Sequence, residues 1–129
     1  MNGVLVDASV LLAILQQERG WEMASSLASG ALISSVNLSE VAARLHERGF
    51  SVDESQYLID QTGVRVLDFS TDHALAAAAM RPLTRAHGLS LADRACLATA
   101  QVEGLKVLTA DRAWLGLAGI VRVEIDSIR

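Results

Sequence analysis

The 129-residue chain has few of the residues that cross-link a chain, and it has no long apolar run. It contains one cysteine, Cys96, so it cannot form an internal disulfide, and we expect a cytoplasmic protein. Cys96 lies within an apolar helical pattern, and we interpret it as a core residue rather than a reactive thiol. The apolar run at residues 10–15 is far shorter than the roughly 20 residues that cross a bilayer. We therefore expect no membrane segment.

Aromatic residues are also scarce, at 4% of the chain, although hydrophobic residues make up 51%. The apolar content is therefore aliphatic and alanine-rich, which suits helices packed on a sheet. This composition is apolar for a lone soluble domain, and it predicts a surface that a partner covers. We interpret Trp114 as a packing residue, and Trp21 as either a packing residue or part of a partner surface.

Positive charge is limited, because the net charge is −4 and Lys106 is the only lysine among the 11 basic residues. This balance excludes a protein that binds polyanions by bulk attraction alone. Arginine nevertheless binds phosphate well. Five arginines on predicted helices are candidates for contact with nucleic acid: Arg44, Arg81, Arg85, Arg94 and Arg112. They could equally be solvated helix charges, and Arg44 has the spacing for an ion pair with Glu40.

Short apolar strands alternate with helical patterns along the whole chain. The predicted strands are residues 4–6, 31–33, 64–67, 106–109 and 121–123, and the predicted helices are 10–15, 21–27, 38–49, 53–60, 72–80, 91–102 and 111–117. Pro82 should end or kink the helix that begins at residue 72. This alternation predicts one α/β domain, residues 1–129, with a mainly parallel central sheet flanked by helices.

Four acids lie where predicted helices begin: Asp7, Glu40, Asp93 and Asp111. Asp7 directly follows the first strand, and Asp111 follows the strand at residues 106–109. The carboxyl ends of parallel strands gather along one edge of the sheet, where such folds bind their ligands. These acids could therefore face one pocket and bind a hard divalent cation through oxygen ligands.

Helix capping is an alternative explanation for the same acids. Segments 37–40 and 90–93 both match a capping box, with the acid three residues after the cap, and Asp7 and Asp111 could be N-caps. Acids also stabilise helix N-termini through the helix dipole. On this interpretation the chain is a non-catalytic α/β interaction module.

Other catalytic patterns are missing from the sequence. It has no glycine-rich phosphate loop, no Cys-His metal pattern and no Gly-x-Ser-x-Gly elbow. We interpret His46, His73 and His87 as surface or capping residues. A phospho-acceptor receiver domain is excluded by spacing, because Asp7 has no acidic neighbour and Lys106 begins its strand rather than ending it.

Four segments carry these acids in a particular order: Val4-Leu-Val-Asp7-Ala-Ser9, Asn37-Leu-Ser-Glu40-Val, Gly88-Leu-Ser-Leu-Ala-Asp93 and Leu108-Thr-Ala-Asp111. Each segment is common alone, but the ordered set is specific, and it resembles the PIN-domain nucleases over essentially the whole chain. Specifically, it resembles the small VapC-type toxins of bacterial toxin–antitoxin pairs. The resemblance implies a PIN-like three-layer fold, a Mg²⁺ or Mn²⁺ site, RNA cleavage, inhibition by a cognate antitoxin and a homodimer.

The resemblance also implies roles for individual residues. By position, the family's acidic quartet corresponds to Asp7, Glu40, Asp93 and Asp111. Asp7 and Asp93 match its most regular metal ligands, and Ser9 and Thr109 match frequent nearby hydroxyls. Because no acid of the quartet is missing, we expect an active copy rather than a degenerate one. We expect possible RNA contacts at Arg94, Arg112 and Arg44.

Overall fold

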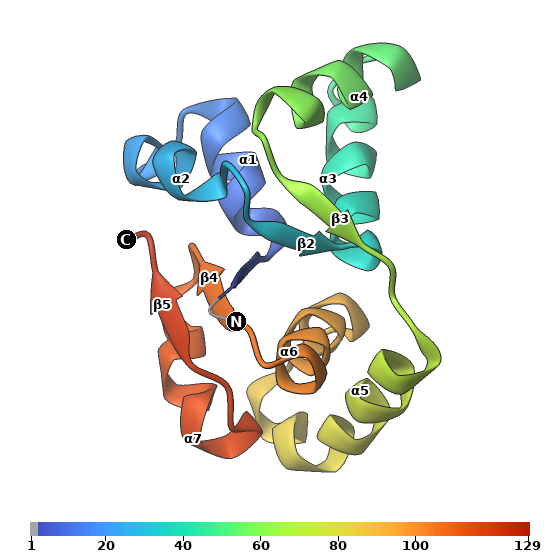
Figure 1. The fold of residues 1–129 in the computed structure, drawn as a ribbon, viewed down its shortest axis with the longest axis vertical. Helices are drawn as coiled ribbons and strands as arrows, with labels where there is room; N and C mark the ends of the chain where they lie inside the picture. The colour runs from blue at the N-terminus through green and yellow to red at the C-terminus, as the bar shows by residue number, and fades with distance from the viewer. Residues whose placement is uncertain (1–2) are drawn as a thin grey trace.

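The computed structural model describes residues 3–129, which form a five-stranded sheet between two layers of helices (Figure 1). The strands are β1 (Val4–Val6), β2 (Leu32–Ser34), β3 (Arg65–Leu67), β4 (Lys106–Thr109) and β5 (Ile125–Ser127). Their order in the sheet is β3-β2-β1-β4-β5, and every neighbouring pair is parallel. The predicted α/β fold with a parallel central sheet is confirmed.

Helices cover both faces of this sheet. They are α1 (Ala8–Gln16), α2 (Trp21–Ala28), α3 (Ser35–Glu47), α4 (Val52–Gln61), α5 (Thr71–Thr84), α6 (Leu91–Glu103) and α7 (Ala118–Val121), with 3-10 helices η1 (Arg85–His87) and η2 (Arg112–Leu117). Helices α1 to α4 lie on one side of the sheet, and α5 to α7 lie on the other (Figure 1). Between residues 3 and 129, none of the helices combines the length and apolarity that spanning a membrane requires.

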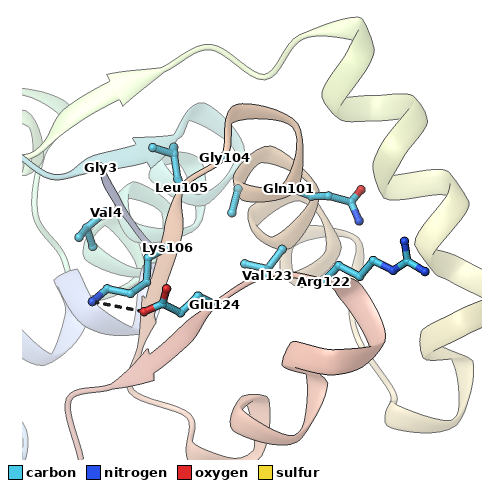
Figure 2. Close-up of a pocket in the computed structure, with 10 residues that line it drawn as sticks. Gly3, Val4, Gln101, Gly104, Leu105, Lys106, Arg122, Val123 and Glu124 are labelled. Atoms are coloured by element: carbon cyan, nitrogen blue, oxygen red, sulfur yellow. Dashed lines mark ion pairs between the residues drawn. The ribbon is translucent and has the colours of Figure 1, made fainter. Parts of the chain in front are cut away.

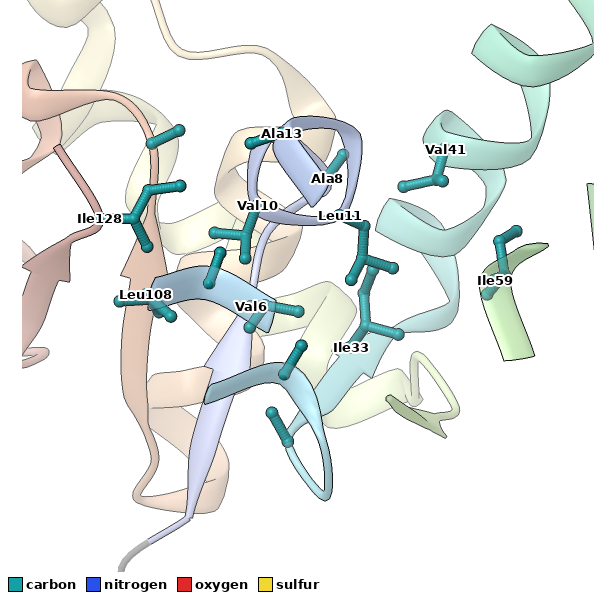
Figure 3. Packing of buried hydrophobic residues seen from close by; sticks show 14 of the residues in the cluster. Val6, Ala8, Val10, Leu11, Ala13, Ile33, Val41, Ile59, Leu108 and Ile128 are labelled. Carbon is teal, nitrogen blue, oxygen red and sulfur yellow. The ribbon is translucent and has the colours of Figure 1, made fainter. Parts of the chain in front are cut away.

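The two cores follow from the alternation of side chains along the short strands. Val6 and Leu108 point into the core beneath α1 to α4, whereas Leu5 and Val107 point into the core beneath α5 to α7. Figure 3 shows the first core, in which Leu11 of α1 packs among the strand side chains. Both faces of the strands are therefore apolar, as expected for a covered parallel sheet.

The order of the strands reverses between β1 and β4. These two strands are neighbours in the sheet, with Val6 opposite Leu108, although about a hundred residues separate them in sequence. Asp7 and Thr109 therefore lie side by side at the carboxyl edge. Such a reversal point is where open α/β sheets place their ligand sites.

The predicted last strand is wrong. Val121 ends α7, Arg122 is left-handed with φ 56°, and the strand forms later, as β5. Val121 and Val123 are both buried in the core beneath α5 to α7. The alternating apolar residues therefore belong to a helix end and a loop. In so short a segment, this pattern cannot be distinguished from that of a strand.

Pro82 does not end its helix, because α5 continues to Thr84 before η1 begins. The Thr84 hydroxyl donates a hydrogen bond to the carbonyl of Met80 at 2.8 Å, which satisfies a helix-end acceptor. Gly88 then takes the left-handed conformation that closes the turn, as predicted. The predicted helix at residues 111–117 is the 3-10 helix η2.

Gly20 should be required by the packing of the segment that follows β5. It has φ 91°, and an added Cβ would lie 2.5 Å from the backbone oxygen of Ile128. We expect Gly20→Ala to lower the free energy of unfolding by about 2 kcal/mol, because it adds both strain and a clash. Urea denaturation measures this change.

The matched control is Gly119→Ala in α7, where an added Cβ meets no atom within 4 Å. Alanine has the higher helix propensity, so this variant should be as stable as the native protein or slightly more stable. Equal effects of the two substitutions would contradict the packing described here.

Candidate active site

Asp7 is a buried carboxylate at the junction of β1 and α1. It is the N-cap of α1, and its Oδ1 accepts hydrogen bonds from the Val10 backbone N–H and the Ser9 hydroxyl. Its Oδ2 accepts a hydrogen bond from the Thr109 hydroxyl at 2.8 Å. Ser9 also accepts the backbone N–H of Ala110 at 2.9 Å. This network links the ends of β1 and β4 through the carboxylate.

Burial determines how Asp7 titrates. Removal from water raises the pKa of the Asp7 carboxyl from 3.8 to about 6, and the charge of Asp93 adds to this rise. The hydrogen bonds from Ser9, Thr109 and Val10 act in the opposite direction and lower the pKa. Because the effect of burial on the pKa exceeds that of the hydrogen bonds, the ionised Asp7 carboxylate is unfavourable in the folded protein. A bound cation would offset this unfavourable charge.

Glu40 reaches the same region from α3, and here the predicted capping box is wrong. The N-cap of α3 is Ser34, whose hydroxyl accepts the Val36 N–H at 3.3 Å, so Asn37 lies inside the helix. Asn37 is 1% exposed, and its Nδ2 donates to Glu40 Oε1 at 2.9 Å and to the carbonyl of Ala92 at 3.1 Å. The sequence prediction placed the cap at Asn37, which requires a loop before it. In the structure α3 follows β2 directly, so the cap lies earlier.

The other two acids do cap helices, as the alternative interpretation predicted. Ser90 and Asp93 form a capping box at the start of α6, with hydrogen bonds of 3.0 and 3.1 Å. Asp111 is the N-cap of η2, and its Oδ1 accepts the Ala113 N–H at 3.0 Å. Capping therefore holds each carboxylate in place and leaves it able to contact a ligand as well.

All four acids line one cavity of about 210 Å³. Its walls also include Ser9, Asn37, Trp114, Ala8 and Leu12. Thr109 lies buried behind Asp7. The convergence that the sheet topology predicted is therefore present, and the acids come from four different elements.

The donor set of this cavity fits a hard divalent cation, because carboxylate and amide oxygens are the ligands that such ions prefer. In residues 3–129, no group of three or more His, Cys, Asp or Glu side chains is already arranged to hold a metal ion. Each carboxylate is instead held by its own hydrogen bonds. The Oδ1 atom of Asn37 is buried and has no hydrogen-bond partner in the described part of the chain. An unpaired buried acceptor beside four acids indicates that the cavity suits a hydrated cation.

Trp114 lines the acidic cavity, and Cys96 lies in the core near the acids. Both are buried in the core beneath α5 to α7, so the prediction that they are packing residues is confirmed. Burial raises the pKa of the Cys96 thiol well above its usual value, and the charges of the acids Asp7, Asp93 and Glu40 raise it further. The thiol is therefore held protonated.

The three arginines proposed to contact RNA are placed very differently. Arg94 is buried, and its Nη1 donates to the carbonyl of Ala77 at 3.0 Å, so its expected contact with RNA is inconsistent with the structure. Its direction follows from α6, which turns the residue after Asp93 towards α5. Arg112 donates to the backbone oxygen of Arg129 at 2.6 Å. Arg44 is exposed and lies 3.6 Å from Glu47 rather than paired with Glu40.

A larger cavity, of about 550 Å³, lies at the amino ends of the strands (Figure 2). Its only lysine, Lys106, is 2.9 Å from Asp126 and 3.9 Å from Glu124. These carboxylates neutralise the ammonium group. The acidic cavity at the carboxyl edge is smaller, but it is therefore the better candidate for the active site.

The fold and this cavity define an α/β domain with an acidic site at the reversal point of a parallel sheet. The PIN domain family model matches residues 4–120. The chain belongs to the PIN domain family.

Solved structures share the fold at low sequence identity. DNA-bound VapBC from Salmonella typhimurium matches with a TM-score of 0.77 and 18% identity over 100% of both chains. A toxin–antitoxin complex from Klebsiella pneumoniae matches with a TM-score of 0.74 and 21% identity over 98% of both chains. FitAcB from Neisseria gonorrhoeae matches with a TM-score of 0.64 and 20% identity over 97% of both chains. No curated protein sequence matches this chain.

The raised pKa of Asp7 predicts that metal-free protein loses stability as the pH rises. Between pH 4 and 6 the folded state retains a proton that the unfolded state has released, so the free energy of unfolding falls. A rise from 3.8 to about 6 corresponds to a loss of about 3 kcal/mol. Asp7→Asn should remove this loss and be more stable than the native protein at pH 7.5 in EDTA.

Urea denaturation at several pH values measures both effects. Asp68→Asn changes an exposed acid in a loop and should keep the native pH dependence. An Asp7→Asn variant that shows the native pH dependence, or that is less stable at pH 7.5, would argue against a charged and buried Asp7.

Proposed function

We propose that this chain is a Mg²⁺- or Mn²⁺-dependent endoribonuclease and the toxin of a toxin–antitoxin pair. The observation that carries the proposal is the convergence of Asp7, Glu40, Asp93 and Asp111 on one cavity. Membership of the PIN domain family supports nuclease chemistry at this cavity.

The four acids would share the binding of the cation unequally. Mg²⁺ keeps several waters and needs only one or two direct carboxylates. Asp7 and Asp93 are the proposed direct ligands, and Glu40 and Asp111 are proposed to act through water. When bound, the ion supplies charge neutralisation for the phosphodiester and lowers the pKa of a water that attacks phosphorus.

Residues of the chain prepare the site for this chemistry. Ser9 and Thr109 fix the orientation of the Asp7 carboxylate, and the capping box at Ser90 fixes Asp93. Trp114 is buried and supplies an apolar wall of the cavity. In the metal-free protein the charge of Asp93 adds to the cost of ionising Asp7, and a bound cation would offset this repulsion.

The alternative, a non-catalytic module with capping acids, explains only part of the site. Asp7, Asp93 and Asp111 do cap helices. Glu40 lies beyond the first turn of α3 and takes its hydrogen bond from the side chain of Asn37. A cap also does not need the burial that raises the pKa of Asp7. Cation binding accounts for both features.

RNA is the proposed substrate. The four carboxylates account for the whole net charge of −4, so the remaining charges balance once the site is neutralised. Arg44 is the best-placed candidate to contact the RNA backbone, because it is exposed on α3 one turn beyond Glu40. Arginine suits such a contact because its guanidinium group binds phosphate bidentately.

A cognate antitoxin and a second copy of the chain are the proposed protein partners. Two of the matched structures are toxin–antitoxin complexes or VapBC assemblies, which supports a partner of this class. The chain also exposes large apolar side chains on helices of both layers, and those on α2 and α4, such as Met23, Leu27 and Tyr57, are candidates for contact with a partner.

Sedimentation equilibrium of the purified chain tests the homodimer. We expect a mass about twice that of the 13.7 kDa chain at micromolar concentration. A mass of one chain at every concentration would overturn the homodimer and leave the site unaffected.

Cleavage of a mixed cellular RNA pool tests the nuclease. With Mg²⁺ or Mn²⁺ we expect discrete fragments that carry a 5′-phosphate and a 3′-hydroxyl, because a water rather than the RNA 2′-hydroxyl attacks phosphorus. EDTA should abolish the cleavage. An Asp7→Asn/Asp93→Asn double variant should also lose it, with a reduction of at least about a hundredfold.

The matched control for this variant is Asp53→Asn/Asp68→Asn, which removes the same charge from exposed positions outside the cavity. This control should cleave like the native protein. Cleavage that persists in EDTA or in the Asp7/Asp93 double variant would overturn the proposed active site.

A further inference from the structure

Asn37 is an uncharged side chain in the wall of the acidic cavity. Its hydrogen bonds indicate what kind of ligand fills the cavity. It is 1% exposed, lines the cavity, and lies one turn before Glu40 on α3. Its Nδ2 donates to Glu40 Oε1 at 2.9 Å and to the carbonyl of Ala92 at 3.1 Å. Both partners are acceptors, so the amide has one orientation only.

This orientation leaves Oδ1 of Asn37 buried and unpaired within the described part of the chain. Leaving a buried acceptor without a donor is costly, so such atoms in folded proteins normally have a partner. Four carboxylates surround the cavity, and ionised carboxylates cannot donate. The missing donor must therefore come from outside the described residues, and a water bound to a cation in this negatively charged cavity can supply it.

We propose that Asn37 is a positioning residue that holds a cation-bound water through Oδ1 and holds Glu40 through Nδ2. This inference rests on the proposed function, because it requires the cation. The separation of the carboxylates supports contact through water, since no set of three in residues 3–129 is arranged to hold a bare ion. The bond to Ala92, which lies directly before Asp93, also sets the spacing between α3 and α6.

Isothermal titration of purified protein with Mn²⁺ and with hexaamminecobalt(III) tests this role without measuring cleavage. The ammine ligands of the cobalt complex do not exchange, so it binds without direct coordination, through charge attraction and the hydrogen bonds that its ligands donate. We expect Asn37→Ala to weaken the binding of both cations by about tenfold, as is typical for a residue that orients metal-bound groups. Ser39→Ala, an exposed change beside Glu40 on α3, should leave both affinities unchanged.

Asn37→Asp separates the two functions of the side chain. It keeps an acceptor oxygen and adds a charge, so Mn²⁺ should bind at least as tightly as to the native protein. It also removes the donor that faces Glu40 and Ala92, so the melting temperature of the metal-free protein should fall. Titrations below that melting temperature keep loss of folding apart from loss of binding.

If the native protein binds Mn²⁺ and Asn37→Ala binds it with the same affinity, the inference is overturned and the proposed function stands. Weaker Mn²⁺ binding with unchanged or undetectable cobalt-complex binding would also overturn it, because the contact would then be direct. Native protein that binds neither cation would overturn the proposed function, and the inference with it.

Discussion

The burial of the Asp7 carboxylate between the ends of β1 and β4 is the constraint on which the rest of the site depends. Hydroxyls of Ser9 and Thr109 and the N–H of Val10 bind it, yet its pKa still rises to about 6 because burial outweighs these bonds. A globular domain gains nothing in stability from a buried charge of this kind. Its presence at the reversal point of the sheet is the feature that the proposed cation would account for.

The remaining acids are arranged around this carboxylate by ordinary helix chemistry. The capping box at Ser90 sets Asp93, and N-capping of η2 sets Asp111. Capping and the proposed cation binding thus use the same residues, with one oxygen engaged by the backbone of the protein and the other side of the carboxylate available. Glu40 is the exception, because within residues 3–129 its side chain is held by the side chain of Asn37 alone. The two elements that carry Glu40 and Asp93 are joined through the same amide.

Sequence patterns were sufficient to predict the alternating strands and helices, the parallel sheet and the convergence of the four acids. They succeeded because a covered parallel sheet needs apolar strands, and because Asp7 and Asp111 follow two of them directly. They failed where one local pattern fits two structures. The apolar alternation at Val121 and Val123 belongs to a helix end, and Asn37 resembles a cap although α3 begins at Ser35. The burial of Arg94 depends on the packing of α6 against α5, which no local pattern contains.

The central claim is that the acidic cavity is a site for a divalent cation. X-ray diffraction from crystals grown with Mn²⁺, measured at the manganese absorption edge, tests it most directly. The account predicts an anomalous peak inside the cavity, within ligand distance of Asp7 and Asp93, and with water between the ion and Asn37. An empty cavity at saturating Mn²⁺, with each acid still engaged only in its capping or side-chain hydrogen bonds, would contradict it.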